Sequence, residues 1–284
     1  MVSKLGAYFR IMRPVNCLMM GFAVAVGSVL ASSNVLSLLW PDVFFGFITG
    51  FGLTAGSMAI NDYFDREIDA INEPKRPIPS RLIKPREALG LAFVLAVIGF
   101  VAAFLTNIFS LVIAAVSWAL FTTYTTVGKR SGLPGNFLVS TCVAIPFVYG
   151  SVVVTNAVQL NVLIFVSMVF LSNTGREITK GIVDFEGDRK QKVRTLAVLF
   201  GDKVAAIAAA VFYISATLLS PIPVLLGLVS FWFIPLVVVT DIGLVFSSVS
   251  LLKDHSRESA RRVKRIVLLW FVIGLLAFLI GAVR

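Results

Sequence analysis

The sequence predicts an all-α membrane protein, a bundle of nine transmembrane helices. Of its 284 residues, 58% are hydrophobic and 14% are charged, and the mean hydropathy is +0.93. Apolar segments of about 20 residues, the length that crosses the hydrocarbon core of a bilayer, recur along the whole chain. Since no soluble domain is evident between them, we treat residues 1–284 as one integral-membrane domain.

Nine segments have this length and this apolar character. In chain order they are 15–33, 42–60, 88–106, 109–127, 136–154, 160–175, 203–219, 224–250 and 265–283. The sixth segment is short, and we expect it to continue as a more polar helix. Asp241 is an acid inside the eighth segment, where such residues usually face a cavity or a partner, so pairing and catalysis both remain open for it. Cys17 and Cys142 lie in apolar segments and are expected to be small buried hydrophobes.

The linkers between these segments alternate in charge. The N-terminus and every second linker hold 24 of the 25 Lys and Arg residues, and the opposite linkers hold none. Basic residues concentrate on the cytoplasmic side of membrane proteins. We therefore expect a multi-pass cell-membrane protein with the N-terminus and the charged linkers in the cytoplasm and the C-terminus outside. The net charge of +10 then reflects topology, and neither nucleic acid nor an obligate protein partner is implied.

The charged linker after the second segment opens with an acidic stripe. Asn61, Asp62, Asp65 and Asp69 fall within about 100° of a helical wheel if the segment continues as helix past the membrane edge. Like charges on one helical face repel. Oxygen ligands clustered in this way suit Mg²⁺, which proteins hold through a few carboxylates together with substrate phosphates.

A second acidic cluster follows the sixth segment. Arg176, Lys180, Asp184 and Asp188 step by four residues and are expected to share one helical face. Solvated acids that cap a helix are the simpler interpretation of one such cluster alone. Two clusters after even-numbered segments, each beside Arg and Lys, favour a common site, because a bundle can bring them together and a divalent metal with a diphosphate would offset their repulsion.

These residues resemble the signatures of the UbiA superfamily of intramembrane prenyltransferases. The NDxxDxxxD signature is present at 61–69 and is followed by the basic, proline-containing stretch KRPIP at 75–79. The DxxxD signature is present at 184–188, and the central-loop segment YTTVGKR occupies 124–130. The nine predicted spans agree with that family's architecture.

The resemblance implies Mg²⁺-dependent transfer of a prenyl group from its diphosphate to an acceptor at the bilayer. The residues that it implies as metal ligands are Asn61, Asp62, Asp65, Asp69, Asp184 and Asp188, with Asp62, Asp65, Asp184 and Asp188 as the catalytic set. The implied substrate contacts are Asn16, Arg76, Tyr124, Lys129, Arg176 and Lys180. Cytoplasmic anchoring is the alternative role for the four bases, and placement at the membrane edge is the alternative for the tyrosine.

Several acceptors are compatible with this resemblance. The terminal segments look most like those of archaeal digeranylgeranylglyceryl phosphate synthases, which implies geranylgeranyl diphosphate as the donor and the free hydroxyl of geranylgeranylglyceryl phosphate, a lipid-like acceptor. The stretch around the first signature also resembles chlorophyll synthases. An aromatic or tetrapyrrole acceptor, such as 4-hydroxybenzoate, a naphthoate or chlorophyllide, is therefore the alternative. A membrane transporter is a remoter one, and no inverted repeat supports it.

Overall fold

The computed structural model describes residues 3–32, 40–126 and 128–282. Within these ranges all regular structure is helical, and nine helices are long and apolar enough to cross a bilayer. This confirms the predicted all-α membrane architecture. The chain divides into two compact units, and the single domain over residues 1–284 stays a prediction.

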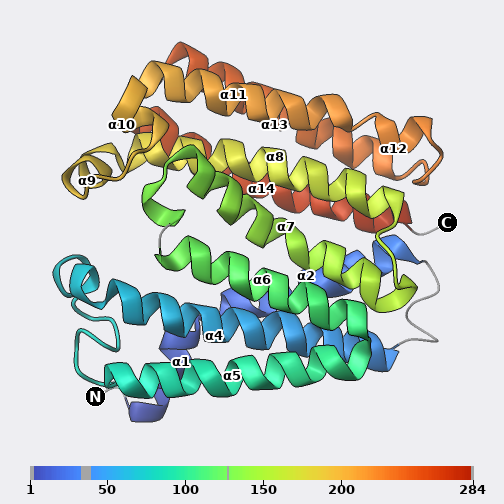
Figure 1. The fold of residues 1–284 in the computed structure, drawn as a ribbon. Coiled ribbons are helices and arrows are strands. Elements are labelled where there is room, and N and C mark those ends of the chain that lie inside the picture. The colour runs from blue at the N-terminus through green and yellow to red at the C-terminus, as the bar shows by residue number, and fades with distance from the viewer. Residues whose placement is uncertain (1–2, 33–39, 127, 283–284) are drawn as a thin grey trace. The chain divides into compact units, whose positions relative to one another are not determined.

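The first unit covers the described parts of residues 1–28, 34–126 and 146–157. Its elements are α1 (Lys4–Met12), most of α2 (Pro14–Ala31), α4 (Trp40–Asn72), α5 (Pro85–Thr106), α6 (Ile108–Thr126) and the C-terminal part of α7 (Leu133–Thr155). Figure 1 shows α4 and α5 side by side, and α6 packs against both. The buried core of this unit consists of Val24, Leu53, Ala103, Ala114, Tyr149 and Val153.

The second unit covers the described parts of residues 29–33, 127–145 and 158–284. Besides the end of α2 and the N-terminal part of α7, its elements are η1 (Gly128–Arg130), α8 (Leu160–Val183), α9 (Phe185–Lys190), α10 (Leu196–Phe200), α11 (Asp202–Leu219), α12 (Ile222–Leu225), α13 (Phe233–Lys253) and α14 (Arg257–Ala282). Helix α8 packs on α11 and α14, and α13 packs on α11 and α14. The fully buried Tyr213, Leu251 and Val267 lie in the core between these four helices.

Helix α4 is much longer than a membrane crossing requires. Its 33 residues extend over roughly 50 Å, whereas the hydrocarbon core of a bilayer is about 30 Å thick. The apolar run of this helix stops at Ile60, and Asn61 begins the first acidic motif. The prediction that the second segment continues as helix beyond its apolar run is therefore confirmed, as is the continuation of the sixth segment into Val183.

The predicted eighth segment, 224–250, is wrong at its start. Helix α13 begins at Phe233, and the preceding residues form the short helix α12 and a turn. Pro221 and Pro223 flank the start of α12, and Gly227 has a φ of 61°. Proline lacks the N–H that a helix interior needs, and glycine adopts positive φ without a steric penalty, so a turn replaces the first part of the expected helix.

Helices α2 and α7 approach each other through glycines in the first unit. A Cβ atom at Gly27 would lie 2.1 Å from the carbonyl oxygen of Phe147, and one at Gly150 would lie 2.0 Å from the carbonyl oxygen of Val24. Ser28 Oγ donates a hydrogen bond across the same contact to the Gly150 carbonyl at 3.0 Å. Small residues allow membrane helices to pack backbone against backbone, and here they fix α2 against the C-terminal part of α7.

The loop between α4 and α5 is held by the N-terminal helix α1. Arg10 donates a hydrogen bond to the Lys75 carbonyl at 3.1 Å, and Lys4 forms an ion pair of 2.8 Å with Glu87 at the start of α5. The apolar cluster beneath these contacts consists of Ala7, Ile11, Ile78, Ile83 and Ala88. Helix α1 thus positions the loop that carries the predicted substrate contact Arg76.

Candidate functional site

The first acidic motif lies at the C-terminal end of α4, in the first unit. Asp62 and Asp69 are buried, with 3% and 6% of their surface exposed, although both are ionisable. Asp65 is half-buried and accepts a hydrogen bond from Asn61 Nδ2 at 3.0 Å. Because α4 is continuous through Asn72, the four polar residues share one helical face, as the stripe predicts.

Two guanidinium groups neutralise the buried carboxylates of this motif. Arg13 Nη2 lies 2.6 Å from Asp62 Oδ1. Arg76 Nη1 lies 2.5 Å from Asp69 Oδ2 and 3.6 Å from Asp62 Oδ1. Burial acts to lower the pKa of Arg76, but its hydrogen bond to Asp69 and the charges of both carboxylates outweigh burial and raise that pKa above its usual value. Removing one arginine would leave a buried carboxylate less well compensated and so destabilise the folded protein.

Arg13 was not among the predicted site residues. It is the C-terminal cap of α1, with φ 52° and ψ 67°, at the point where the chain turns into α2. Pro14 follows directly and disfavours a helical conformation at the preceding residue, so the turn is encoded locally. The signal in the sequence was a base immediately before the proline at the start of the first span. This signal does not identify the partner of the base, because Asp62 lies 49 residues away.

Three other predicted substrate contacts are Asn16, Tyr124 and Lys129. Asn16 is exposed in the first turn of α2. Tyr124 is half-buried near the end of α6 and lies in ring contact with Phe121, with the centroids 6.5 Å apart. The side chain of Lys129 lies outside the described part of the structure. The roles assigned to these three residues stay predictions.

The second acidic motif does not continue α8, so the expectation of one helix face running from Arg176 through Asp188 is corrected. Helix α8 ends at Val183, and Asp184 adopts φ −96° and ψ 10° before α9 begins. In a continuous helix the Val183 carbonyl would accept from the N–H four residues later. Here it accepts a hydrogen bond from Arg257 Nε at 2.9 Å. Asp184 therefore joins two helices, and Asp188 lies one turn further, in α9.

The charge of Asp184 disfavours ionisation of Asp188. Burial and the charge of Asp184 raise the pKa of Asp188 to about 6, while the Lys180 ammonium acts in the opposite direction. Among the described residues, no group of three or more His, Cys, Asp or Glu side chains is placed to hold a metal by itself. The motif therefore offers a few hard oxygen ligands, and Mg²⁺ that also binds substrate phosphates needs only a few. The donor chemistry of both motifs fits such an ion.

Replacing Asp188 with asparagine should stabilise the metal-free protein at neutral pH. The pKa of Asp188 in the folded protein, about 6, exceeds the ordinary aspartate value of 3.8. Below pH 3.8 its carboxyl group is neutral in both states and does not affect stability, whereas above about pH 6 its ionisation destabilises the folded state by the full amount. With solvent screening of this half-exposed group, we expect a Tm higher by roughly 1–3 °C near pH 7.5 in detergent with EDTA, and no difference near pH 4. Glu186→Gln, on the exposed side of α9, is the control that leaves Tm unchanged. A Tm gain of equal size at both pH values would contradict this explanation.

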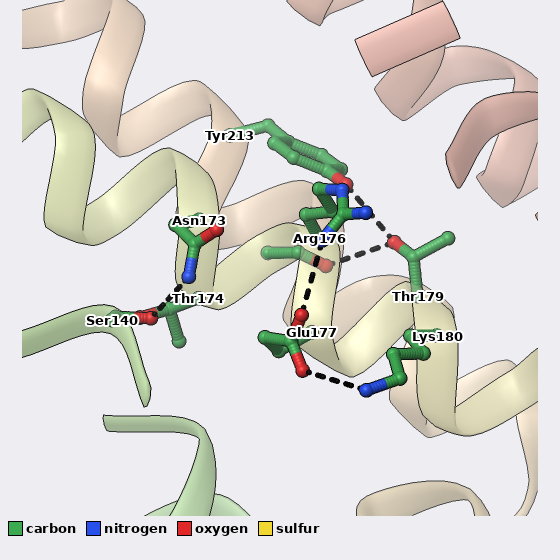
Figure 2. Close-up of polar contacts among 9 residues, drawn as sticks. Ser140, Asn173, Thr174, Arg176, Glu177, Thr179, Lys180 and Tyr213 are labelled. Atoms are coloured by element: carbon green, nitrogen blue, oxygen red, sulfur yellow. Dashed lines mark hydrogen bonds and ion pairs between the residues drawn. The ribbon is translucent and has the colours of Figure 1, made fainter. Parts of the chain in front are cut away.

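Helix α8 carries charged side chains just before the second motif (Figure 2). Glu177 accepts a hydrogen bond from Arg176 Nη1 at 3.1 Å, and its other oxygen lies 3.3 Å from Lys180 Nζ. The Nε atom of Arg176 is buried and has no hydrogen-bond partner among the residues that the structure describes. A buried donor left without a partner costs about 1–3 kcal/mol. An anion that accepted a hydrogen bond from this Nε atom would remove that cost, so the Arg176 guanidinium retains the capacity to bind an anion.

Buried polar contacts hold this part of α8 against its neighbours in the second unit. Tyr213 of α11 shares a hydrogen bond of 3.1 Å with Thr179, and both residues are fully buried. Ser140 of α7 accepts hydrogen bonds from Asn173 at 3.1 Å and from Thr174 at 2.9 Å (Figure 2). These contacts on the opposite sides of α8 restrict its rotation and so fix the direction in which its charged side chains point.

Backbone hydrogen bonds connect the second motif to η1. The Asp188 carbonyl accepts from the Val193 N–H at 2.8 Å, and the Arg194 N–H donates to the Arg130 carbonyl at 3.2 Å. Gly132 has a φ of 72°, and a Cβ atom there would lie 1.9 Å from the Arg194 carbonyl oxygen. Only glycine satisfies both conditions, so the two segments are joined closely along their backbones.

Asp241, the acid inside α13, is paired. Ser220 Oγ donates a hydrogen bond to Asp241 Oδ2, while Asp241 Oδ1 is buried with no partner within the described ranges. The pairing role that the sequence left open is therefore observed, and a catalytic role stays untested. Cys17 is buried, as expected, whereas Cys142 is only half-buried, so the expectation of two buried cysteines is wrong for Cys142.

Comparison with known proteins identifies the family. The model of the UbiA prenyltransferase family matches residues 19–281. The chain is 37% identical to the digeranylgeranylglyceryl phosphate synthase of Archaeoglobus fulgidus, over 98% of this chain and 96% of that protein. It is also 37% identical to the digeranylgeranylglyceryl phosphate synthase of Korarchaeum cryptofilum, over 100% of this chain and 99% of that one.

Solved structures share the fold. One reported for digeranylgeranylglyceryl phosphate synthase in membranes is similar with a TM-score of 0.86 at 32% identity, covering 99% of both chains. A UbiA homologue from Archaeoglobus fulgidus bound to GPP and Mg²⁺ has a TM-score of 0.71 at 17% identity, covering 96% of this chain and 99% of that one. The protein thus belongs to the UbiA prenyltransferase family of intramembrane enzymes.

Proposed function

We propose that the protein transfers a geranylgeranyl group from geranylgeranyl diphosphate to the free hydroxyl of geranylgeranylglyceryl phosphate, a step of archaeal ether-lipid synthesis. The observation that carries this proposal is the 37% identity, over nearly the whole chain, to proteins named as synthases of the corresponding product. That likeness favours a lipid acceptor over the aromatic and tetrapyrrole acceptors of other family members.

The proposal assigns the leaving diphosphate to the two acidic motifs. The ligands proposed for Mg²⁺ are Asn61, Asp62, Asp65, Asp69, Asp184 and Asp188. Mg²⁺, when bound, would stabilise the negative charge that grows on the leaving diphosphate. Support for this ion comes from the oxygen donors of both motifs and from the UbiA homologue that was solved with GPP and Mg²⁺.

Arg13 and Arg76 are proposed to serve the same diphosphate. Each guanidinium forms an ion pair with a carboxylate of the first motif through one nitrogen, and a guanidinium carries further N–H donors in a planar fork. Hydrogen bonds from such a fork to phosphate oxygens are charge-assisted and directional. The two arginines therefore hold the acids in place and still present positive charge to the departing group.

Arg176 and Lys180 are proposed to bind the phosphate of the acceptor. The buried Nε of Arg176 that lacks a partner supports an anionic ligand at this point, and Glu177 holds both bases in place. The acceptor hydroxyl oxygen then forms a bond to C1 of the prenyl group as the bond from C1 to the diphosphate breaks. The electron pair of that bond leaves with the diphosphate, and the hydroxyl proton is released. On this proposal, an apolar site for the prenyl chain would exclude water, which would otherwise capture the allylic cation that develops as the bond to the diphosphate breaks.

The membrane orientation belongs to the same proposal. We propose that the N-terminus and both acidic motifs face the cytoplasm and that the C-terminus lies outside. The support is the distribution of 24 of the 25 Lys and Arg residues over alternate linkers, because short basic linkers are retained on the cytoplasmic side. Water-soluble Mg²⁺ and diphosphate would then meet the enzyme on the side where the cell supplies them.

A panel of acceptors tests the proposed function. Purified protein with radiolabelled geranylgeranyl diphosphate and Mg²⁺ should form product with geranylgeranylglyceryl phosphate, and EDTA should abolish it. Little product is expected with 4-hydroxybenzoate or chlorophyllide. Product with an aromatic or tetrapyrrole acceptor alone would refute the ether-lipid assignment and leave family membership intact.

The same assay tests the acceptor-phosphate contacts. Arg176→Ala should lower kcat/KM about 10- to 100-fold for the phosphorylated acceptor, because a charge-assisted contact of about 1.5–3 kcal/mol is lost. The loss should be much smaller with geranylgeranylglycerol, which lacks the phosphate. An equal loss with both acceptors, together with a raised KM for the diphosphate, would assign Arg176 to the donor instead.

A further inference from the structure

Arg257, the first residue of α14, reaches the C-terminal end of α8. Its Nε donates a hydrogen bond of 2.9 Å to the carbonyl of Val183, a residue that is 3% exposed. The last carbonyl groups of a helix have no partner within the helix, and a cation near them interacts favourably with the helix dipole. Arg257 thus caps α8 at the residue immediately before Asp184.

This cap coincides with the break between α8 and α9. Asp184 has φ −96° and ψ 10°, whereas a residue within an α-helix has values near −63° and −42°. In an unbroken helix Asp188 would follow Asp184 at a rise of about 6 Å and a rotation of about 40°. The Asp188 N–H still donates to the Asp184 carbonyl at 2.9 Å, so the two acids remain one helical turn apart. The break instead frees this turn from the direction of α8, so its orientation depends on what holds the ends of the two helices.

Several contacts hold these ends, and all lie in the second unit. The Asp188 N–H donates to the Asp184 carbonyl at 2.9 Å, and the Asp188 carbonyl accepts from Val193. Arg257 Nη1 lies 3.9 Å from Glu186 Oε2, but both side chains are largely exposed, and such a pair contributes little. Phe185 packs against the core of the second unit, and the hydrogen bond from Arg257 to the Val183 carbonyl adds a directional side-chain contact from α14 at the break itself.

We propose that Arg257 is a positioning residue for the second acidic motif. By holding the Val183 carbonyl it keeps α8 from continuing past Asp184, and so sets the orientation, relative to α8, of the turn on which Asp184 and Asp188 bind a cation. The inference rests on the proposed role of these two acids as metal ligands. Arg257 acts through the backbone and is assigned no contact with the metal or the substrate.

Hydrogen exchange in the metal-free protein tests this role directly. Arg257→Ala should alter amide exchange within residues 183–190 and leave the rest of α8 and α14 as in the wild type. Arg257→Lys keeps a cation and a donor at the same position and should show a smaller change. Arg261→Ala, an exposed position one turn further along α14, is the matched control and should show none.

The Mg²⁺ dependence of prenyl transfer gives the second readout. The Mg²⁺ concentration for half-maximal activity should rise about tenfold in Arg257→Ala, the size of effect expected when a residue supporting metal ligands is removed. Arg257→Lys should restore most of the affinity, and excess Mg²⁺ should restore most of kcat. If Arg257→Ala does not fold, the Arg257→Lys variant decides, with a two- to threefold rise expected.

Three results separate the outcomes. Wild-type exchange over residues 183–190 together with a wild-type Mg²⁺ dependence in both Arg257 variants would overturn the positioning role. A wild-type Mg²⁺ dependence in Asp184→Asn would overturn the metal assignment in the proposed function, whatever the Arg257 variants show. A fall in kcat with unchanged Mg²⁺ dependence would also reject the inference, because it would assign Arg257 to another part of the reaction.

Discussion

Asp184→Ala is expected to lower kcat/KM for prenyl transfer by roughly 10³-fold, the cost of removing a group that stabilises charge in a transition state. The carboxylate lies at the junction of α8 and α9, beside Asp188, whose pKa its charge helps to raise. Without it, the second motif keeps one of its two aspartates and, on the proposed function, would no longer hold the Mg²⁺ that stabilises the leaving diphosphate. Transfer from radiolabelled geranylgeranyl diphosphate, measured at saturating and subsaturating Mg²⁺, checks this expectation.

Asp62→Ala should cause a fall of similar size, since it removes the buried acid that Arg13 and Arg76 both approach. The matched controls are Glu67→Ala and Glu258→Ala. The side chains of these two acids are 85% and 83% exposed, so their variants should retain wild-type transfer. Unchanged transfer in both Asp62→Ala and Asp184→Ala would refute the assignment of the two motifs to the donor diphosphate.

Gly150→Val should destabilise the protein by about 3 kcal/mol or more and lower its Tm by roughly 10 °C. A Cβ atom at this position would lie 2.0 Å from the Val24 carbonyl oxygen and 2.7 Å from the Ser28 nitrogen. Both are backbone atoms of α2, which do not move aside as the end of a flexible side chain does. The two helices must separate, and the hydrogen bond from Ser28 to the Gly150 carbonyl is lost. Thermal unfolding in detergent measures the effect.

Gly90→Ala is the control for that substitution. Gly90 lies within α5, and a Cβ atom there would meet nothing within 4 Å. Because glycine loses more backbone entropy in a helix than alanine does, this variant should gain about 0.5–1 kcal/mol. A loss of stability in Gly90→Ala as large as that in Gly150→Val would contradict the explanation by close helix contact.

The sequence predicts the parts of the molecule that depend on local pattern. The hydropathy of the nine segments identifies the membrane helices, because apolar length alone decides whether a segment can span the bilayer. The spacing of Asn61, Asp62, Asp65 and Asp69 likewise identifies one helical face, because a helix repeats every 3.6 residues. Where proline and glycine interrupt an apolar run, as before Phe233, hydropathy overestimates the length of the helix.

Features that depend on distant residues could not be predicted in this way. The break at Asp184 coincides with a hydrogen bond from Arg257, 74 residues away from the carbonyl that accepts it. The pairing of Arg13 with Asp62 depends on the turn between α1 and α2 and on the position of α4. Neither contact leaves a periodic trace in the sequence, because each joins single residues on separate helices.

The packing of α1 on the loop after α4 has a consequence for how the protein can change in evolution. Ala7 and Ile11 share one apolar cluster with Ile78 and Ile83, and Arg76, on the same loop as these two isoleucines, binds Asp69. A larger side chain at position 7 would shift the loop and with it the arginine, unless position 78 or 83 became smaller. The N-terminal helix, which carries no acidic motif residue, is therefore expected to covary with that loop and to be conserved for the geometry of the site.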